Sequence, residues 1–500
     1  MLTLLIAIPI VAAIAILLGA CPKKTALLSA TLNLFITLAA LFRYDSSAAG
    51  YQFQFSRMLM ADWKLSFFVG ADGLSLLMLL LTALVTFAAV WVAPRPEKIE
   101  RWPNLYYACL LFIAAGATGA FASLDLFFLY AFHELALIPT FLLIGLWGSG
   151  DRVTAAWKIT IYLALGSIIL LIGLLGLYVN LPDTARTFNL VELQKLAPGV
   201  IPQTSWVYLF LMLGFGILVS IFPFHSWAPS AYASAPAPAA MLHAGVLKKF
   251  GLYGLLRVAM PLMPQAAQHW NGLLMLLLCG NILYIGLATI AQKRLDTMLG
   301  FSSVMHMGYI FLGLASFNLI GVSGAALLMF AHGLSIAALF AIAGAVRQRT
   351  GTLEFSQLGG LAKPLPFLGF TFGLAAFASI GLPGFANFAA ELLVFFGAFK
   401  RPETLATGLH FFSHPILANY RVVTVIALWG VVISAVYMLR GYRAAFLGET
   451  NKRWASLTDV CQCVRVPIVL LLAVLLVAGF RPQYFLNLVT PTVKTFLVTK

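Results

Sequence analysis

Long stretches of mostly apolar residues, each about 20 residues long, recur along the chain and alternate with short polar connections. A helix needs roughly 20 apolar residues to cross the hydrocarbon core of a bilayer, which is about 30 Å thick. Because the strands of a membrane barrel are shorter and alternate in polarity, these stretches predict helices. We therefore expect an all-α integral membrane protein with about 14 transmembrane helices. The predicted helices begin near Leu2, Thr25, Gly70, Leu105, Leu124, Ala155, Ser205, Ala237, Gly272, Thr297, Gly321, Phe367, Arg421 and Val464.

Two of the predicted helices are interrupted by their own residues. Pro223 closes the segment Ser220–Pro223 inside the seventh helix, and Pro383 lies in Ser379–Gly384 inside the twelfth. Proline removes a backbone donor and clashes with the preceding turn, and glycine loosens a helix further. A simple kink is the alternative for either break alone. Because the breaks are an odd number of helices apart, the broken helices run in opposite directions, which is typical of inverted repeats around an ion site near the midplane.

These repeats divide the chain into four parts, none of which is a soluble domain. The longest polar connections, at about 44–69, 181–204 and 399–420, are too short to fold as one. We expect two inverted five-helix repeats between an N-terminal group of helices and a last helix. The predicted parts are 1–104 with helices 1 to 3, 105–261 with helices 4 to 8, 262–445 with helices 9 to 13, and 446–500 with a loop and helix 14.

The composition supports a membrane protein and excludes several other classes. Of the 500 residues, 62% are hydrophobic and 9% are charged, whereas about a quarter of the residues in a soluble protein are charged. A soluble enzyme, a disordered protein and a disulfide-stapled secreted domain are therefore excluded. The formal net charge of +15 fits basic loops beside anionic cytoplasmic lipids, and we expect no nucleic-acid partner.

The distribution of Lys and Arg among the loops predicts the orientation. Loops that follow odd-numbered helices hold more of these residues, including Arg95, Lys98, Arg440 and Lys452. Because basic loops face the cytoplasm, the N-terminus is expected outside, and an even number of helices places the C-terminus outside too. We expect an integral protein of a bacterial inner membrane.

The sequence contains no motif for a cofactor. It has no Gly-rich nucleotide loop, no cysteine cluster for an iron–sulfur centre and no convincing histidine pair for haem. Cys461 and Cys463 are close together, but too few other ligands are nearby for a metal site. We therefore expect no cofactor and no metal in this chain, so that any associated redox chemistry belongs to other chains.

Ionisable residues lie inside several predicted helices, where a charge costs about 2.5–3.5 kcal/mol. They are Glu134, Lys158, Lys248, Lys249 and Glu391. A carboxyl group bonded to a neighbouring helix, or a lysine that snorkels to the headgroups, is the purely structural alternative, and Lys158 suits snorkelling nearly as well as function. Because a metal site would concentrate its ligands, the spread of these groups over successive helices favours proton transfer.

His306 and His332 lie inside two further apolar helices. A histidine titrates near neutral pH and can pass protons, and a hydrogen-bonded core histidine is the alternative. A lysine close to a carboxylate favours the charged form of both groups, whereas separation in a buried site drives each towards neutrality. The proton occupancy of one group then depends on its neighbour, which predicts lateral proton movement along a polar axis.

Seven segments carry a specific pattern when they are taken together. They are Ala71–Ser75, Glu134–Gly148, Ala155–Lys158, Pro223–Trp227, Ala244–Arg257, Ser302–Gly308 and Gly381–Glu391. From about residue 70 to residue 445 the chain resembles the antiporter-like membrane subunits of respiratory complex I, the proton-translocating NADH:quinone oxidoreductase. It is most similar to the M type, which corresponds to mitochondrial NADH dehydrogenase subunit 4.

The resemblance implies a fold, residue roles and partners. The family has fourteen helices in two inverted units, with broken seventh and twelfth helices. By position, Glu134 is similar to its fifth-helix glutamate, Lys249 to its eighth-helix lysine and Glu391 to its twelfth-helix glutamate. His306 and His332 fall on its central polar axis. The implied partners are other membrane subunits, a peripheral NADH-oxidising arm and lipids.

The chain also departs from the family pattern. Leu218, five residues before Pro223, replaces a lysine that usually pairs with the fifth-helix glutamate, and Lys248 is an additional lysine. We hypothesise that Lys248 substitutes for the missing lysine; an incidental Lys248 in a partly altered module is the alternative. The connection Gln292–Thr297 lacks the family's usual order of acidic then basic residues.

We therefore expect a subunit of NADH:quinone oxidoreductase that conducts protons. A subunit of a Mrp-type sodium/proton antiporter or of a membrane-bound hydrogenase is the second hypothesis, and the neighbouring genes would distinguish it. A non-conducting membrane scaffold of the same fold is the third, because Leu218 replaces the usual lysine.

Overall fold

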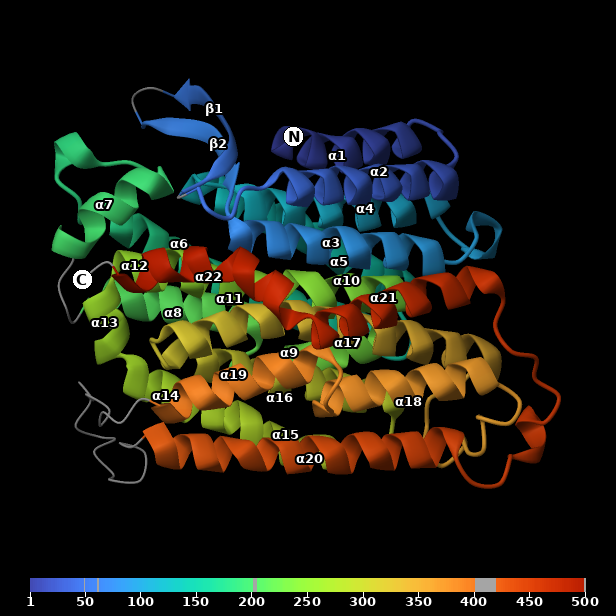
Figure 1. Ribbon diagram of the computed structural model, residues 1–500. Helices are drawn as coiled ribbons and strands as arrows, with labels where there is room; N and C mark the ends of the chain where they lie inside the picture. Colours follow the sequence, from blue (N-terminus) through green and yellow to red (C-terminus); the bar gives the residue numbers. More distant parts are fainter. Residues whose placement is uncertain (49, 61–62, 201–204, 401–419, 499–500) are drawn as a thin grey trace.

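The computed structural model describes residues 1–48, 50–60, 63–200, 205–400 and 420–498. Its helices lie side by side along one long direction (Figure 1). Among the described residues, ten helices are long and apolar enough to cross a membrane. They are α2 (Pro22–Arg43), α3 (Gly73–Val92), α4 (Pro103–Ala122), α5 (Leu126–Trp147), α6 (Arg152–Val179), the run of α14 (Asn271–Cys279) and α15 (Ile285–Ile290), α16 (Leu295–Ala315), α17 (Leu319–Thr350), α20 (Tyr420–Phe446) and α21 (Gln462–Phe480).

Four further segments are consistent with the remaining predicted crossings. The first is α1 (Leu2–Leu17), which is short but apolar. The other three are interrupted: α8 (Trp206–Val219) with α9 (Trp227–Ser234), α10 (Ala237–Leu242) with α11 (Lys249–Gly254) and α12 (Met260–Leu262), and α18 (Pro366–Ile380) with α19 (Ala386–Lys400). The structure confirms that the seventh and twelfth predicted helices are broken, at the segments that contain Pro223 and Pro383.

Several elements lie outside the predicted helices. They are the antiparallel strands β1 (Gln52–Met60) and β2 (Leu65–Ala71), α7 (Leu190–Val200), α13 (Pro264–His269) and α22 (Pro482–Val498). The hydrophobic pattern does not predict the hairpin because β1 is largely exposed on both faces. The hairpin and α7 occupy the connections 44–69 and 181–204, and the connection 399–420 lies almost entirely outside the described residues.

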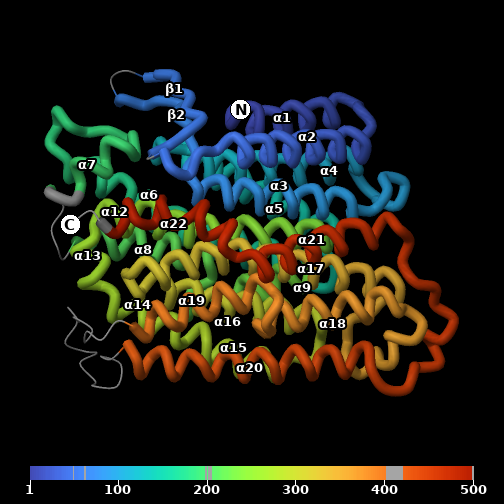
Figure 2. The backbone as a smooth tube through the Cα atoms, viewed as in Figure 1, coloured from blue at the N-terminus to red at the C-terminus, as the bar shows by residue number. Residues whose placement is uncertain are grey.

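One end of the bundle, the hairpin end, carries β1, β2, α7 and the C-terminus (Figure 1). α22 follows α21 and continues along the bundle towards this end (Figure 2). The N-terminus lies there as well, because Arg43, at the end of α2, approaches the sulfur of Met1 to 4.0 Å. Both chain ends therefore lie at the same end of the bundle, as an even number of crossings requires.

The opposite end, the loop end, is formed by the connections after α3, α5, α9, α15, α17 and α20. Backbone hydrogen bonds join these connections to one another. The amide of Ser149 donates to the carbonyl of Ser234 at 2.8 Å, and the amide of Gly360 donates to the carbonyl of Leu447 at 3.0 Å.

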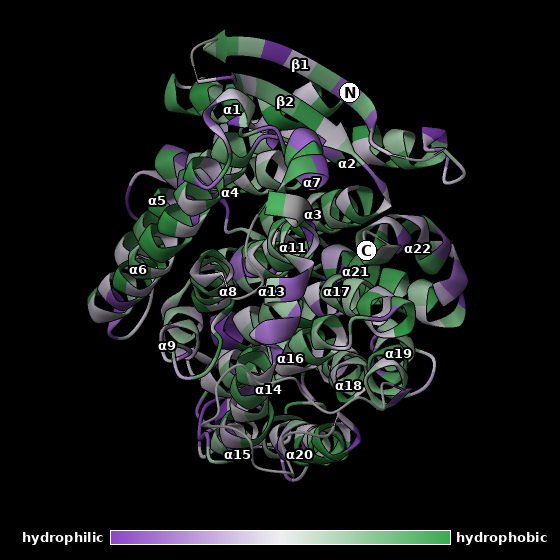
Figure 3. Cartoon of the chain, turned by 90° about the vertical axis from the view of Figure 1, so that its left-hand side faces the viewer, coloured by the Kyte–Doolittle hydropathy of each residue, from purple (hydrophilic) through white to green (hydrophobic). Residues whose placement is uncertain are grey.

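The central helix is α17, which packs against α3, α10, α16, α18, α19, α21 and α22. Its most apolar stretch of 18 residues is entirely buried. Viewed along the helices, α5 and α6 lie on one outer side of the bundle and α15 and α20 at another (Figure 3). Polar side chains on α17 are therefore enclosed by protein, whereas those on α5 and α6 can face lipid or another chain.

The first break is stabilised by Asn281, a fully buried side chain in the run of α14 and α15, two crossings further along the chain. Its amide nitrogen donates to the carbonyls of Ser220, at 3.2 Å, and Val304, at 3.1 Å. Its amide oxygen accepts a hydrogen bond from the backbone N–H of Phe222 at 2.7 Å. Because backbone groups at membrane depth must be satisfied within the protein, Asn281 allows the chain to leave α8 before Pro223.

Two crossings contain three π-helical turns, each next to a buried polar side chain. The turns are His243–Leu247, Leu255–Ala259 and Gly280–Tyr284. Lys248 and Lys249 follow the first turn, Arg257 lies in the second and Asn281 in the third. Turns of this kind appear as single insertions in α-helices and are frequent at functional sites.

Replacing Asn281 with alanine should destabilise the first break, because it leaves buried backbone groups of Ser220 and Phe222 without their partner. Each orphaned group costs about 1–3 kcal/mol. We expect a clear fall in the midpoint of thermal unfolding of the purified, assembled protein in detergent.

The matched control is Asn33→Ala, which removes one buried hydrogen bond, from the Asn33 amide to the carbonyl of Leu5 at 3.0 Å. A loss for Asn281→Ala no larger than that for Asn33→Ala would contradict the role of Asn281.

Candidate functional site

A row of buried polar side chains crosses the bundle from α11 to the second break. Lys249, the first residue of α11, is completely buried. Its Nζ donates to the carbonyl of Ala244, in the first π-helical turn, at 2.5 Å and lies 3.0 Å from Nδ1 of His332 on α17. Lys249 is thus in direct contact with the next ionisable group.

The row continues from His332 to His306 on α16. The centroids of the two imidazole rings are 5.4 Å apart. Nδ1 of His306 lies 2.8 Å from the carbonyl oxygen of Ser302, and Nε2 lies 2.9 Å from that of Ser379, the residue before Ile380 at the end of α18. Because carbonyl oxygens only accept hydrogen bonds, only a doubly protonated imidazole can donate to both at once. His306 is therefore placed to hold a second proton.

Glu391 lies at the other side of the second break, on α19, and is buried. Its carboxylate contacts the position that a side chain would occupy at Gly381. Gly381 also has a φ of +83°, a conformation that favours glycine. Oε1 of Glu391 has no hydrogen-bond partner among the described residues. The second break thus brings a carboxylate close to the carbonyl group that faces His306.

Lys248 is also buried but belongs to a different set of contacts. Its Nζ lies 3.4 Å from the hydroxyl of Ser303 and 5.6 Å from the centroid of the Tyr232 ring. The Tyr232 hydroxyl in turn lies 3.1 Å from Nδ1 of His243. The sequence analysis singled out neither Tyr232 nor His243, which lies near the start of its predicted helix.

Glu134 is not part of the row but lies on the outer side formed by α5 and α6. Its side chain is 38% exposed, accepts a hydrogen bond from the hydroxyl of Ser167, and lies 3.7 Å from Nδ1 of His133. The His133 ring stacks on Phe250, the neighbour of Lys249, with a centroid distance of 4.1 Å. Among the described residues, no ion pair joins Glu134 to Lys248, so a direct replacement of the missing lysine is not observed.

The usual lysine position of the seventh helix is filled by apolar packing. Leu218 is buried, and its methyl group packs close to Gly166 on α6. Lys158, near the start of α6, is partly exposed.

A second buried polar cluster lies towards the hairpin end, and the sequence did not predict it as a site. The guanidinium of Arg257 forms two hydrogen bonds of 2.5 Å with the two carboxylate oxygens of Asp72, the residue that caps α3. It also donates to the hydroxyls of Ser75, at 2.9 Å, and Tyr253, at 3.2 Å. Asp72 and Arg257 each stand in a family segment, but nothing in the sequence shows that they pair.

Aromatic rings complete the enclosure of Arg257. The centre of its guanidinium lies 5.1 Å from the centroid of Tyr51 and 5.2 Å from that of Phe496 on α22. Tyr51 precedes β1, so this cluster joins the hairpin segment, α3, the eighth crossing and the C-terminal helix.

No group of three His, Cys, Asp or Glu side chains within the described ranges is arranged to hold a metal ion. Cys461 and Cys463 form a disulfide with each other.

The chain matches the family model described as NADH:quinone oxidoreductase/Mrp antiporter, TM, over residues 123–416. The chain belongs to this family. NADH-quinone oxidoreductase subunit M of Rickettsia conorii is 33% identical over 474 residues, which cover 95% of this chain and 92% of the relative.

Solved structures give the same result for this member of the NADH:quinone oxidoreductase/Mrp antiporter family. A chain of respiratory complex I from Thermus thermophilus is similar with a TM-score of 0.87 and 29% identity, covering 99% of each chain. A chain of the Mrp complex from a Dietzia species shares the fold, with a TM-score of 0.85 and 22% identity over 99% of this chain and 97% of that one. The comparisons confirm the resemblance inferred from the seven segments.

Replacing Asp72 with asparagine should strongly destabilise this family member. Asparagine keeps a cap for α3, but it leaves the buried charge of Arg257 without a counter-ion, a change that costs about 3–5 kcal/mol in proteins. Thermal unfolding of the assembled protein in detergent would measure this loss.

The matched control is Asp183→Asn, which breaks the ion pair with Arg186 at the surface, where the Asp183 side chain is 85% exposed. This exposed pair contributes about 0–1 kcal/mol. Equal effects of the two substitutions would show that the Arg257 cluster does not hold the fold.

Proposed function

We propose that this chain is the M-type membrane subunit of an NADH:quinone oxidoreductase and that it moves protons along the row from Lys249 to Glu391. The observation that carries the proposal is the 3.0 Å contact between Nζ of Lys249 and Nδ1 of His332, one ring away from His306. The similarity to a subunit M over 95% of the chain supports the assignment to this assembly.

The geometry supports a stepwise transfer. When the ammonium of Lys249 gives one proton to Nδ1 of His332, a neutral amine and an imidazolium remain. His332 passes a proton on towards His306, whose two nitrogens each lie within hydrogen-bond distance of a carbonyl oxygen, so that the protonated ring can donate to both. Glu391 then takes up the proton at the second break and becomes a neutral acid. Return of a proton to Lys249 resets the row.

Redox chemistry belongs to other chains in this proposal. NADH oxidation takes place in a peripheral arm, and this chain contributes proton movement with no cofactor of its own. The half-exposed carboxyl of Glu134 supports a neighbouring membrane subunit on the α5–α6 side, because a charge facing lipid costs about 2.5–3.5 kcal/mol. Lipids cover the remaining apolar faces, and Lys158 and Glu134 lie where protons would pass to or from that neighbour.

The orientation follows from the basic residues at the loop end. The connections after α3 and α20 carry Arg95, Lys98, Lys452 and Arg453. Because basic loops face the cytoplasm, we place the loop end inside and the hairpin end, with both chain termini, outside a bacterial inner membrane.

Three other functions are compatible with this fold. A subunit of a Mrp-type antiporter has the same fold, but the solved Mrp chain is 22% identical, compared with 29% for the complex I chain. A membrane-bound hydrogenase is the related alternative, and the genes that neighbour this one would distinguish these assemblies. A non-conducting scaffold is favoured only by Leu218, which removes one lysine but leaves the row intact.

Replacing Glu391 with glutamine should abolish proton movement, because the amide keeps the size of the side chain but cannot take up a proton. We expect the rate of NADH-driven proton uptake by inverted membrane vesicles to fall about tenfold or more, with the complex fully assembled. Lys249→Met should have the same effect.

The matched control is Glu192→Gln on α7, where the side chain is exposed. Uptake that is as fast with Glu391→Gln as with Glu192→Gln would exclude the proposed row and favour the scaffold.

The role of Lys248 can be separated from that of Lys249. If Lys248 replaces the missing seventh-helix lysine functionally, both Lys248→Leu and Lys249→Leu should lower proton uptake in the same vesicles. Normal uptake with Lys248→Leu, together with a loss for Lys249→Leu, would show that Lys248 is incidental.

A further inference from the structure

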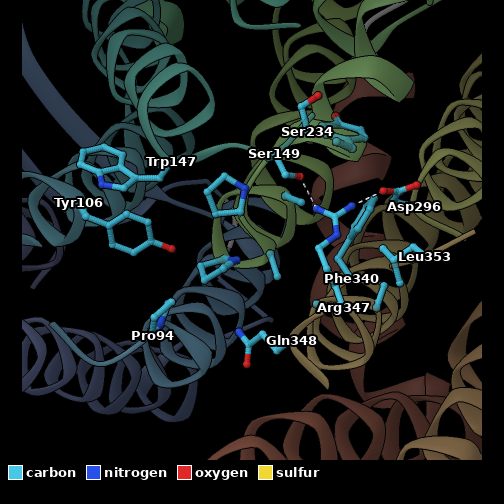
Figure 4. A pocket seen from close by; sticks show the side chains of 18 residues that line it. Pro94, Tyr106, Trp147, Ser149, Ser234, Asp296, Phe340, Arg347, Gln348 and Leu353 are labelled. Carbon is cyan, nitrogen blue, oxygen red and sulfur yellow. Dashed lines mark hydrogen bonds and ion pairs between the residues drawn. The ribbon is translucent and has the colours of Figure 1, made fainter. Parts of the chain in front are cut away.

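A pocket of about 180 Å³ opens at the loop end between α5, α9, α10 and α17 (Figure 4). Ser149 and Gln348, which line it, are exposed, whereas Tyr106 and Tyr232 are buried. The pocket therefore leads from the surface to two tyrosine rings inside the bundle. The hydroxyl of Tyr106 has no hydrogen-bond partner among the described residues.

Tyr232 connects this pocket to ionisable groups in the interior. Its hydroxyl lies 3.1 Å from Nδ1 of His243, and its ring lies 5.6 Å from Nζ of Lys248. The other ring nitrogen of His243, Nε2, is buried and has no hydrogen-bond partner within the described part of the chain. A buried histidine that served only to fill the core would be expected to satisfy both nitrogens, because unpaired buried polar atoms are costly.

Lys248, the group farthest from the pocket, lies beside the row from Lys249 to Glu391. Lys248 precedes Lys249, which is in contact with His332. Lys248 also lies 3.4 Å from the hydroxyl of Ser303 on α16. The pocket, Tyr232, His243 and Lys248 thus follow one another from the surface towards the row.

An ion-pair cluster fixes the mouth of the pocket. Arg347 pairs with Asp296, donates to the hydroxyl of Ser149 at 2.7 Å and donates to the carbonyl of Ala233 at 3.1 Å (Figure 4). Arg347 therefore ties α17 to α16, to the connection after α5 and to the end of α9. The acidic residue at position 296 belongs to the connection that departs from the family's charge order, and here it has an arginine partner.

We infer that this pocket is the proton inlet of the chain from the loop end and that Tyr232 and His243 carry protons from it to Lys248. The inference rests on the proposed function and adds to it an entry route. It gives Lys248 a role that does not need contact with Glu134.

The transfer is balanced at each atom. A hydronium ion in the pocket gives a proton to the oxygen of Tyr232 and becomes water, as the hydroxyl proton moves to Nδ1 of His243. The imidazolium then releases the proton at Nε2 towards the neutral amine of Lys248, which becomes an ammonium. Tyr232 ends as a hydroxyl and His243 as a neutral ring with its proton on Nδ1, and one proton has moved from the pocket to Lys248. The ring regains its starting tautomer by rotating or by exchanging this proton with water before the next transfer.

The first experiment blocks the mouth of the pocket. Gln348→Cys in the assembled complex is treated with a membrane-impermeant maleimide, applied to inverted vesicles whose outer face is the cytoplasmic one. We expect NADH-driven proton uptake to fall about tenfold or more after labelling and to stay normal before it. The control is Lys452→Cys, which is exposed at the same end but does not line the pocket.

Equal uptake by the two labelled variants would overturn the inlet. A parallel treatment of the unchanged protein measures the background from its own cysteines, of which Cys21 is exposed.

The second experiment removes the carriers themselves. Tyr232→Phe removes only the hydroxyl, and His243→Leu removes both ring nitrogens. We expect either substitution to slow proton uptake about tenfold or more, whereas Tyr208→Phe, a change of a buried tyrosine on α8 away from the pocket, leaves it unchanged.

Glu391→Gln separates the two proposals in the same assay. If Glu391→Gln stops uptake but Tyr232→Phe and His243→Leu do not, the row stands and this inlet is wrong. If Glu391→Gln also leaves uptake normal, the proposed function itself fails.

Discussion

The structure depends on one constraint: at membrane depth, each interrupted backbone group and each charge must find a partner inside the protein. The two broken helices meet this demand differently. At the first break the side-chain amide of Asn281 donates a hydrogen bond to the carbonyl of Ser220. At the second break Nε2 of His306 lies within hydrogen-bond distance of the carbonyl of Ser379. The group at the second break, His306, is titratable. The hydrogen bond that supports the broken helix therefore also influences how many protons His306 holds.

The two adjacent lysines that follow the first π-helical turn serve different neighbours. Side chains that follow each other on a helix point about 100° apart. Lys249 therefore reaches His332 on the central helix, while Lys248 reaches Ser303 and the ring of Tyr232. The carbonyl of Ala244 within the turn accepts a hydrogen bond from Lys249, which keeps this ammonium in place. One short irregular segment thus serves both an entry route and a transfer row.

Much of the fold was predictable because a chain in lipid must satisfy its backbone hydrogen bonds internally, which leaves helices of about 20 apolar residues as the main solution. Length and apolarity identify the crossings, and Pro223 and Pro383 mark the broken helices. Burial of Lys249 and Glu391 was also expected from their position inside apolar stretches. The role of these residues in proton transfer stays a prediction, as do the boundaries of the two repeats.

The pairing of residues that are distant in sequence could not be predicted in the same way. Asp72 and Arg257 are 185 positions apart, and only the packing of α3 against the eighth crossing brings them together. Hydrophobicity also does not reveal that Glu134 faces outward. A carboxylate within an apolar helix gives the same sequence pattern whether it faces the bundle or the outside. Three-dimensional packing decides both questions.

The enclosure of Arg257 has a consequence for biosynthesis. Tyr51, close to the start of the chain, and Phe496, close to its end, cover the same guanidinium. Because a chain is made from its N-terminus onward, the ring of Phe496 can reach the cluster only after the helices that carry Asp72 and Arg257 have been made. Until then one side of the guanidinium stays uncovered, so the enclosure of Arg257 is completed late in synthesis.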